Sequence, residues 1–147
     1  MYALTIILKL AHLIGLALGL GSATVKIALL LRCNRNYNLY PDFIKASKPV
    51  TRLLISGIIL LVLSGTGWLI TGYPLTTLMI IKIILVVLVF ASGAVIDNVV
   101  EPTLKKLLPT PGESPTQPFI QIQKRHLLLE IAATMAMYAI TVIGVFL

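Results

Sequence analysis

The sequence is poor in charged residues, and in acidic ones above all. Only 12% of its 147 residues are charged, and Asp and Glu together number five, whereas 58% of the residues are hydrophobic. The mean hydropathy of +0.99 lies far outside the range of soluble globular proteins. A soluble fold is therefore excluded, and we expect an integral membrane protein with one domain, residues 1–147.

Cysteine is almost absent as well. Cys33 is the only one, so no internal disulfide can form, and there is no CxxC or other metal-ligand spacing. The sequence also lacks a Walker loop, a dinucleotide-binding fingerprint, an HExxH motif and a nucleophile elbow. It therefore contains no motif for the chemistry of common soluble enzymes.

The net charge of +7 comes from basic residues that are grouped along the chain. Nine of the twelve lie in two segments between apolar runs: Arg32, Arg35, Lys45, Lys48, Arg52, Lys105, Lys106, Lys124 and Arg125. This grouping is the positive-inside signal, so we expect both segments to face the cytoplasm and to contact anionic lipid headgroups rather than nucleic acid. The predicted location is the inner (plasma) membrane of a bacterium or archaeon.

Four apolar runs are long enough to cross a hydrocarbon core about 30 Å thick as helices. We predict helices over about 3–31, 50–71, 75–100 and 122–147. The second and third are joined by a turn at Gly72-Tyr73-Pro74. The predicted fold is an all-α integral membrane bundle of four transmembrane helices, with the N and C termini on the outer or periplasmic side.

Two cytoplasmic loops, 32–49 and 101–121, complete this prediction. In the first, residues 42–48 are expected to form a short interfacial helix before Pro49. Five of the eight prolines lie between Glu101 and Lys124, so we predict that this stretch is not helical.

Polar residues recur at helical spacing within the apolar runs. On the first helix they share one face with small residues, and on the third and fourth they form similar stripes. The stripes are His12, Gly15, Gly19, Ser22 and Lys26; Lys82, Val86, Val89, Gly93 and Asp97; and Glu130, Thr134, Met137, Thr141 and Gly144. Because lipid cannot satisfy polar groups, we expect these faces to point into the bundle.

The rise of a helix places these residues at two depths. Lys26 lies about 21 Å deeper than His12, and Asp97 about 22 Å deeper than Lys82. The predicted outer pair is therefore His12 with Lys82. The predicted inner polar cluster contains Lys26, Asp97 and Glu130. His126 is a further candidate, although its neighbours Lys124 and Arg125 suggest a place at the membrane surface.

The inner cluster has two interpretations. The simpler one is structural: acids and bases at one depth neutralise each other and fasten the first, third and fourth helices together. The alternative is a proton or ion path through Glu130.

The outer pair is less easily explained, because no Asp or Glu is expected at the depth of Lys82. An isolated ammonium in hydrocarbon costs several kcal/mol, so Lys82 is neutral, reaches outward to the headgroups, or pairs with an anion such as a haem propionate. His12 then has three open interpretations. It bonds a backbone carbonyl or Thr141, it ligates haem iron, or it ligates copper. Met137 or Lys82 is a candidate second axial ligand.

Four segments resemble a superfamily that includes the CopD copper-resistance membrane domain, HemJ-type protoporphyrinogen oxidases and related small membrane proteins. These segments are "LKLAHLIGLALGLGSATV", "SKPVTRLLISGIILLVLSGTGWLI", "TTLMIIKIILVVLVFASGAVI" and "KRHLLLEIAATMAMYAITVIGVF", in that order. HemJ-type proteins bind haem b, and the resemblance implies that His12 and Lys82 are the matching histidine and lysine.

These observations together predict a membrane protein that binds haem b and acts in electron transfer or in oxidation of a membrane-delivered substrate. Whether it is a haem-dependent oxidoreductase stays open. One alternative is a non-enzymatic subunit of a larger membrane complex or homo-oligomer, since Gly15-x-x-x-Gly19 suits helix contacts. The other alternative is copper transport.

Overall fold

The computed structural model of the protein describes residues 2–110 and 113–145. Its elements are α1 (Tyr2–Arg35), the 3₁₀ turn η1 (Tyr37–Leu39), α2 (Tyr40–Ile70), α3 (Thr77–Val95), the π-helical turn η2 (Ile96–Val100), α4 (Glu101–Lys106) and α5 (Gln117–Val145). The described residues contain no strand. Pro111 and Gly112 of the predicted loop 101–121, and the last two residues of the predicted helix 122–147, lie outside them.

Four helical segments are long and apolar enough to cross a membrane. They are Tyr2–Arg35, Tyr37–Ile70, Thr77–Lys106 and Gln117–Gly144. Most of their large apolar side chains are exposed on the outside of the bundle, where lipid would satisfy them. The all-α class and the four candidate membrane spans are thus confirmed for the part of the chain that the structure describes.

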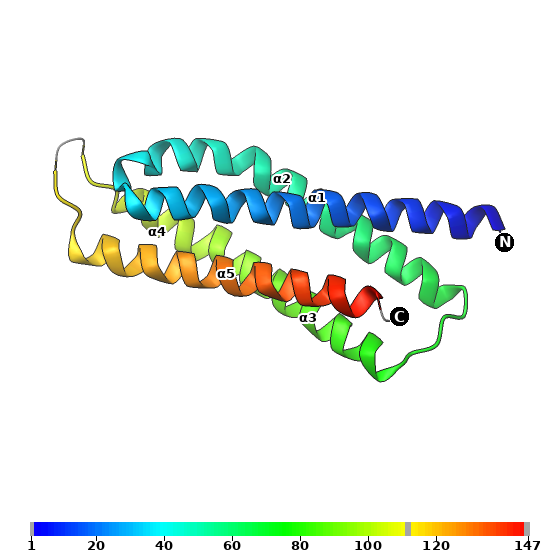
Figure 1. The fold of residues 1–147 in the computed structure, drawn as a ribbon. Helices are drawn as coiled ribbons and strands as arrows, with labels where there is room; N and C mark the ends of the chain where they lie inside the picture. Colours follow the sequence, from blue (N-terminus) through cyan, green and yellow to red (C-terminus); the bar gives the residue numbers. More distant parts are fainter. Residues whose placement is uncertain (1, 111–112, 146–147) are drawn as a thin grey trace.

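The helices associate as two pairs. α1 packs along α2, α3 packs against α5, and the pairs meet mainly through α1 and α5 (Figure 1). Within the described residues α2 and α3 do not pack against each other, although only residues 71–76 connect them. Figure 1 shows both termini at the end of the bundle where that connection lies, and the loop after α4 at the other end.

The contact between α1 and α2 is built on three glycines. A Cβ atom added at Gly15 would lie 2.9 Å from the carbonyl oxygen of Gly57, and one added at Gly57 would collide with the backbone nitrogen of Gly19. The two backbones therefore approach more closely than any side chain permits. Small residues allow such packing in membranes, where no hydrophobic effect drives helices together.

The first predicted loop is wrong in its extent. Helix α2 begins at Tyr40, so residues 42–48 continue into the membrane span, and Pro49 lies inside the helix. Pro41 occupies the first turn, where a missing N–H costs nothing. Pro49 removes one helical hydrogen bond, and the surrounding turns still hold the helix, with the Ser47 hydroxyl donating to the Ile44 carbonyl at 3.1 Å.

The second predicted loop is wrong for the same reason. Residues Glu101–Lys106 are helical, with Pro102 in the first turn, and α5 begins at Gln117, just before Pro118. Proline at the start of a helix lacks a donor that would have no partner there anyway. The non-helical connection is thus residues 107–116, and the third span continues through η2 into α4.

An aromatic core closes the end of the bundle near α4. The Tyr40 ring contacts the rings of Phe43 and Phe119 edge to face, with centroids 5.6 and 5.5 Å apart. The core consists of Leu30, Cys33, Tyr40, Phe43, Val100, Leu104 and Phe119. Every helix contributes to it except α3, and together they seal this end.

We predict that Gly57→Ala destabilises the protein by about 1–3 kcal/mol, because the added methyl group forces α1 and α2 apart. The measurement is the thermal unfolding midpoint in detergent, followed by circular dichroism. Gly21→Ala is the matched control, since a Cβ atom at Gly21 meets nothing within 4 Å. Equal midpoints for the two variants would contradict the close crossing.

Candidate functional site

Polar side chains inside the bundle form two groups, one near each end. The first, which we call the ion-pair cluster, consists of Lys26, Glu101, His126 and Glu130. The second is a cavity that contains His12 and Lys82, which we call the His12 cavity. The polar residues that were expected at two depths thus lie in two separate groups, and each group has its own chemistry.

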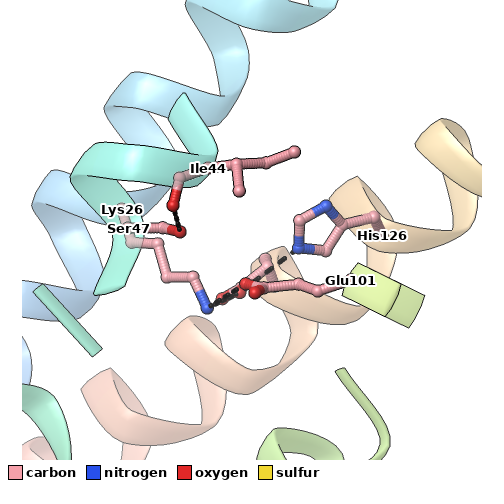
Figure 2. A network of polar contacts seen from close by, with 6 residues as sticks. Lys26, Ile44, Ser47, Glu101 and His126 are labelled. Atoms are coloured by element: carbon pink, nitrogen blue, oxygen red, sulfur yellow. Dashed lines mark hydrogen bonds and ion pairs between the residues drawn. The ribbon is translucent and has the colours of Figure 1, made fainter. Parts of the chain in front are cut away.

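Lys26 is the centre of the ion-pair cluster. Its Nζ atom lies 2.6 Å from Oε1 of Glu130 and 3.3 Å from Oε1 of Glu101. Figure 2 shows Lys26 of α1 reaching toward Glu101 of α4. Lys26 and Glu130 are buried, with 3% and 4% exposure. One ammonium thus joins three helices, and each carboxylate compensates part of the cost of burying it.

His126 belongs to this cluster rather than to the membrane surface. Its side chain is fully buried, and Nε2 lies 3.6 Å from Oε1 of Glu130, one helical turn away. The Phe43 ring contacts the imidazole edge to face, with centroids 5.9 Å apart. The neighbouring Lys124 and Arg125 suggested an exposed position for His126, but its side chain faces the interior of the bundle, because α5 begins at Gln117 and His126 lies more than two turns inside that helix.

Asp97 does not join the cluster directly. Its side chain is exposed, and it makes no ion pair with any residue that the structure describes. Glu101 takes the expected place. Sequence reasoning missed Glu101 because Pro102 seemed to end the helix. The signal was present, since Glu101 follows Asp97 by four residues and continues the stripe that contains Lys82.

Two carboxylates and one imidazole of the ion-pair cluster lie close enough together to bind a metal cation. One ligand atom from each of Glu101, His126 and Glu130 lies within 4.8 Å of the others. The Lys26 ammonium already lies against both carboxylates and supplies the positive charge that such a site requires. We therefore assign no metal to this cluster.

The His12 cavity measures about 700 Å³ and is lined by all four long helices. Its volume is typical of small-molecule and cofactor sites, and like them it has mainly apolar walls and a few polar groups. The functional groups among its lining residues are His12, Thr66, Met79, Lys82, Met137 and Thr141.

His12 is hydrogen-bonded to Ser64, with its Nδ1 atom 2.9 Å from the Ser64 Oγ atom. The same Oγ atom lies 3.1 Å from the Leu61 carbonyl oxygen, to which the hydroxyl can donate. With its hydrogen on that carbonyl, Ser64 accepts from Nδ1–H of His12, and Nε2 then carries the lone pair. No described residue bonds the opposite nitrogen, Nε2. In this tautomer His12 presents a free lone pair on Nε2, and its partner Ser64 is a residue that the sequence analysis did not single out.

Lys82 has no acidic partner among the described residues. Its Nζ atom lies against α5, where a Cβ atom added at Gly144 would be 3.2 Å from it. His12 and Lys82 interact electrostatically. The predicted outer pair therefore lines one cavity, and neither Thr141 nor a backbone carbonyl bonds His12, because Ser64 does.

Trp68, on α2, stacks against the imidazole ring of His12. The two rings are stacked with centroids 6.1 Å apart, and Tyr73 contacts the indole from the turn after α2. The Nε1–H group of Trp68 is buried and has no hydrogen-bond partner in the described part of the chain. Trp68 thus helps to hold the imidazole ring in its orientation.

No family model, curated protein or solved structure matches the chain. The geometry of its own residues is therefore the basis for assigning a function.

We predict that Lys26→Met destabilises the protein by about 3–5 kcal/mol, because two buried carboxylates lose their shared counter-charge. The measurement is the free energy of unfolding in mixed micelles titrated with denaturing detergent. Lys105→Met is the control, since Lys105 is exposed on α4. A loss no larger than that of the control would show that the ion pairs contribute nothing to stability.

Proposed function

We propose that the protein binds one haem b in the His12 cavity, with His12 as an axial ligand. The observation that carries this proposal is the Nε2 atom of His12, which no described residue bonds, in a cavity that also holds Lys82, which has no acidic partner among the described residues. A haem supplies the two groups that would complete these side chains, an iron ion and carboxylates. The proposal places the protein with the CopD and HemJ-like membrane proteins that its sequence resembles.

Ser64 and Trp68 would position the ligand. A histidine that binds a metal usually donates its other N–H group to an acceptor, which fixes the tautomer and the ring orientation. Ser64 accepts that bond here, and Trp68 stacks on the ring. The free imidazole thus already has the arrangement that a metal ligand needs, so ligation would require little reorganisation.

Lys82 would bind a propionate, and Met137 is the candidate second axial ligand. Lys82 can donate three hydrogen bonds to carboxylate oxygens and offset their charge. The thioether of Met137 lines the same cavity and is 7% exposed. Lys82 itself remains a second candidate for the axial position. The apolar walls would exclude water from the iron.

The haem would supply one-electron redox chemistry when bound. The surrounding residues support electron transfer or the oxidation of a substrate that arrives through the membrane, because the cavity walls are apolar. Under the positive-inside rule, the cavity would lie in the half of the inner membrane that faces away from the cytoplasm, with both termini on that side.

Copper transport is the second candidate, and one observation favours it. Met79 and Met137 line the same cavity as His12, and soft thioethers with imidazole suit Cu(I). Lys82 weighs against it, because an ammonium in the same cavity repels a cation and attracts an anion. A non-enzymatic subunit of a larger complex is the third candidate, and it leaves the free Nε2 lone pair without a role.

We predict that the purified protein shows a Soret band that shifts on reduction with dithionite. His12→Ala should abolish the band, whereas His126→Ala, which changes the only other histidine, should retain it. Absorption spectroscopy of the protein isolated in mild detergent makes this measurement. A colourless preparation with one bound copper would instead support copper transport, and one with neither would support the accessory role.

We predict that Ser64→Ala weakens haem binding by about 10- to 100-fold, because the imidazole loses the acceptor that fixes its tautomer. The dissociation constant is measured by titrating haem into the apoprotein. Ser56→Ala is the control on the same helix, since the exposed Ser56 hydroxyl bonds only the Arg52 carbonyl. An unchanged dissociation constant for Ser64→Ala would contradict the proposal that the bond from Ser64 positions His12 for haem binding.

A further inference from the structure

The charges of the ion-pair cluster do not balance when His126 is neutral. Lys26 carries one positive charge, and Glu101 and Glu130 carry two negative charges. The result is one uncompensated negative charge in a buried site, which is costly in a medium of low dielectric constant. One additional proton would make the cluster neutral.

His126 is the group best placed to hold that proton. Both of its ring nitrogens are buried and have no hydrogen-bond partner among the residues that the structure describes, and Nε2 lies 3.6 Å from Glu130 Oε1. Figure 2 shows a ring nitrogen of His126 turned toward Lys26 and Glu101. A proton on Nε2 would convert this contact into an ion pair between imidazolium and carboxylate.

Each element packed around His126 contributes one or more other titratable groups to its surroundings. These groups are Lys26 on α1, Tyr40 on α2, Asp97 on η2, Glu101 on α4 and Glu130 on α5. The Tyr40 hydroxyl is buried without a hydrogen-bond partner and interacts electrostatically with Glu101 and Glu130. No basic group besides Lys26 lies among them to neutralise the second carboxylate.

Acidic groups along one helix face connect this site to the surface of the protein. Asp97 is exposed on η2, and Glu101 follows one turn later, with 14% of its side chain exposed. Asp97 interacts electrostatically with Lys26, Glu101 and Glu130. The π-helical turn that carries Asp97 is a feature that proteins often place at functional sites.

We propose that the ion-pair cluster is a proton-binding site that takes one proton from the aqueous face beside Asp97 and holds it on His126. A carboxylate oxygen of Asp97 takes a proton from hydronium, which leaves as water. That O–H bond breaks as one forms on Glu101, and the second O–H bond breaks in turn as Nε2–H of His126 forms; one ligand atom of Glu101 lies within 4.8 Å of one of His126. No electron moves, and release follows the same steps in reverse. This site is independent of whether a haem occupies the His12 cavity.

The test uses the fact that the chain has only two histidines. The full-length protein is labelled with ¹⁵N-histidine and reconstituted in lipid bilayers, and solid-state NMR separates imidazolium from the neutral tautomers. His12→Gln assigns the two signals. At neutral pH the proposal expects His126 as imidazolium in the wild-type protein. A neutral His126 there would overturn the proposal without any variant of the cluster.

Two variants test the charge and the route. Glu130→Gln should leave His126 neutral at the same pH. The control Glu113→Gln, in the exposed loop, should leave His126 as imidazolium.

Asp97→Asn should slow protonation of His126 after a pH jump by about 100-fold, without changing the final extent of protonation. The control Asp42→Asn should leave this rate unchanged. Time-resolved infrared spectroscopy of the imidazole follows the rate. An imidazolium that persists in Glu130→Gln, or an unchanged rate in Asp97→Asn, would overturn the corresponding step.

Discussion

The contact of one lysine with two glutamates determines how the helices of this protein are held together. The four candidate spans are long and apolar enough to cross a membrane. In a bilayer, lipid would be as apolar as their surfaces, so the hydrophobic effect would not drive the helices into contact. The pair of α1 and α2 relies on glycine packing, but the junction between this pair and α3 with α5 needs another source of attraction. Lys26 provides it, because its ammonium lies 2.6 Å from Glu130 and 3.3 Å from Glu101. The aromatic core around Tyr40 then closes the same end of the bundle.

The two ends of the bundle differ in how their polar groups are satisfied. In the ion-pair cluster, the chain supplies both the cation and the anions. In the His12 cavity, it supplies a fixed imidazole with a free lone pair and an ammonium without an acidic partner among the described residues. The first arrangement is complete within the protein except for one proton. The second is suited to a ligand that brings both an electrophilic centre and negative charge, which is why a haem fits it better than a bare copper ion.

The sequence was sufficient for the four candidate spans of the described residues and for the two separate groups of polar residues, because apolar run length and helical spacing are local properties. It located Lys26 and Glu130 in one group and His12 and Lys82 in another. It failed where proline occurred near helix ends, since a proline in the first turn looks the same as one that breaks a helix. Glu101 was therefore assigned to a loop and Asp97 took its place. Ser64 could not be identified, because its role depends on which face of α2 meets His12.

The missing contact between α2 and α3 has a mechanical consequence. At the end of the bundle that holds the His12 cavity, the pair of α1 and α2 is linked to the pair of α3 and α5 by the short connection 71–76 and by the contact of α1 with α5. A change in the angle between the pairs would widen or narrow the His12 cavity without breaking the Lys26 ion pairs at the far end. In a bilayer, lateral pressure and membrane thickness would act on that angle. The lipid environment would then help to set the size of the site.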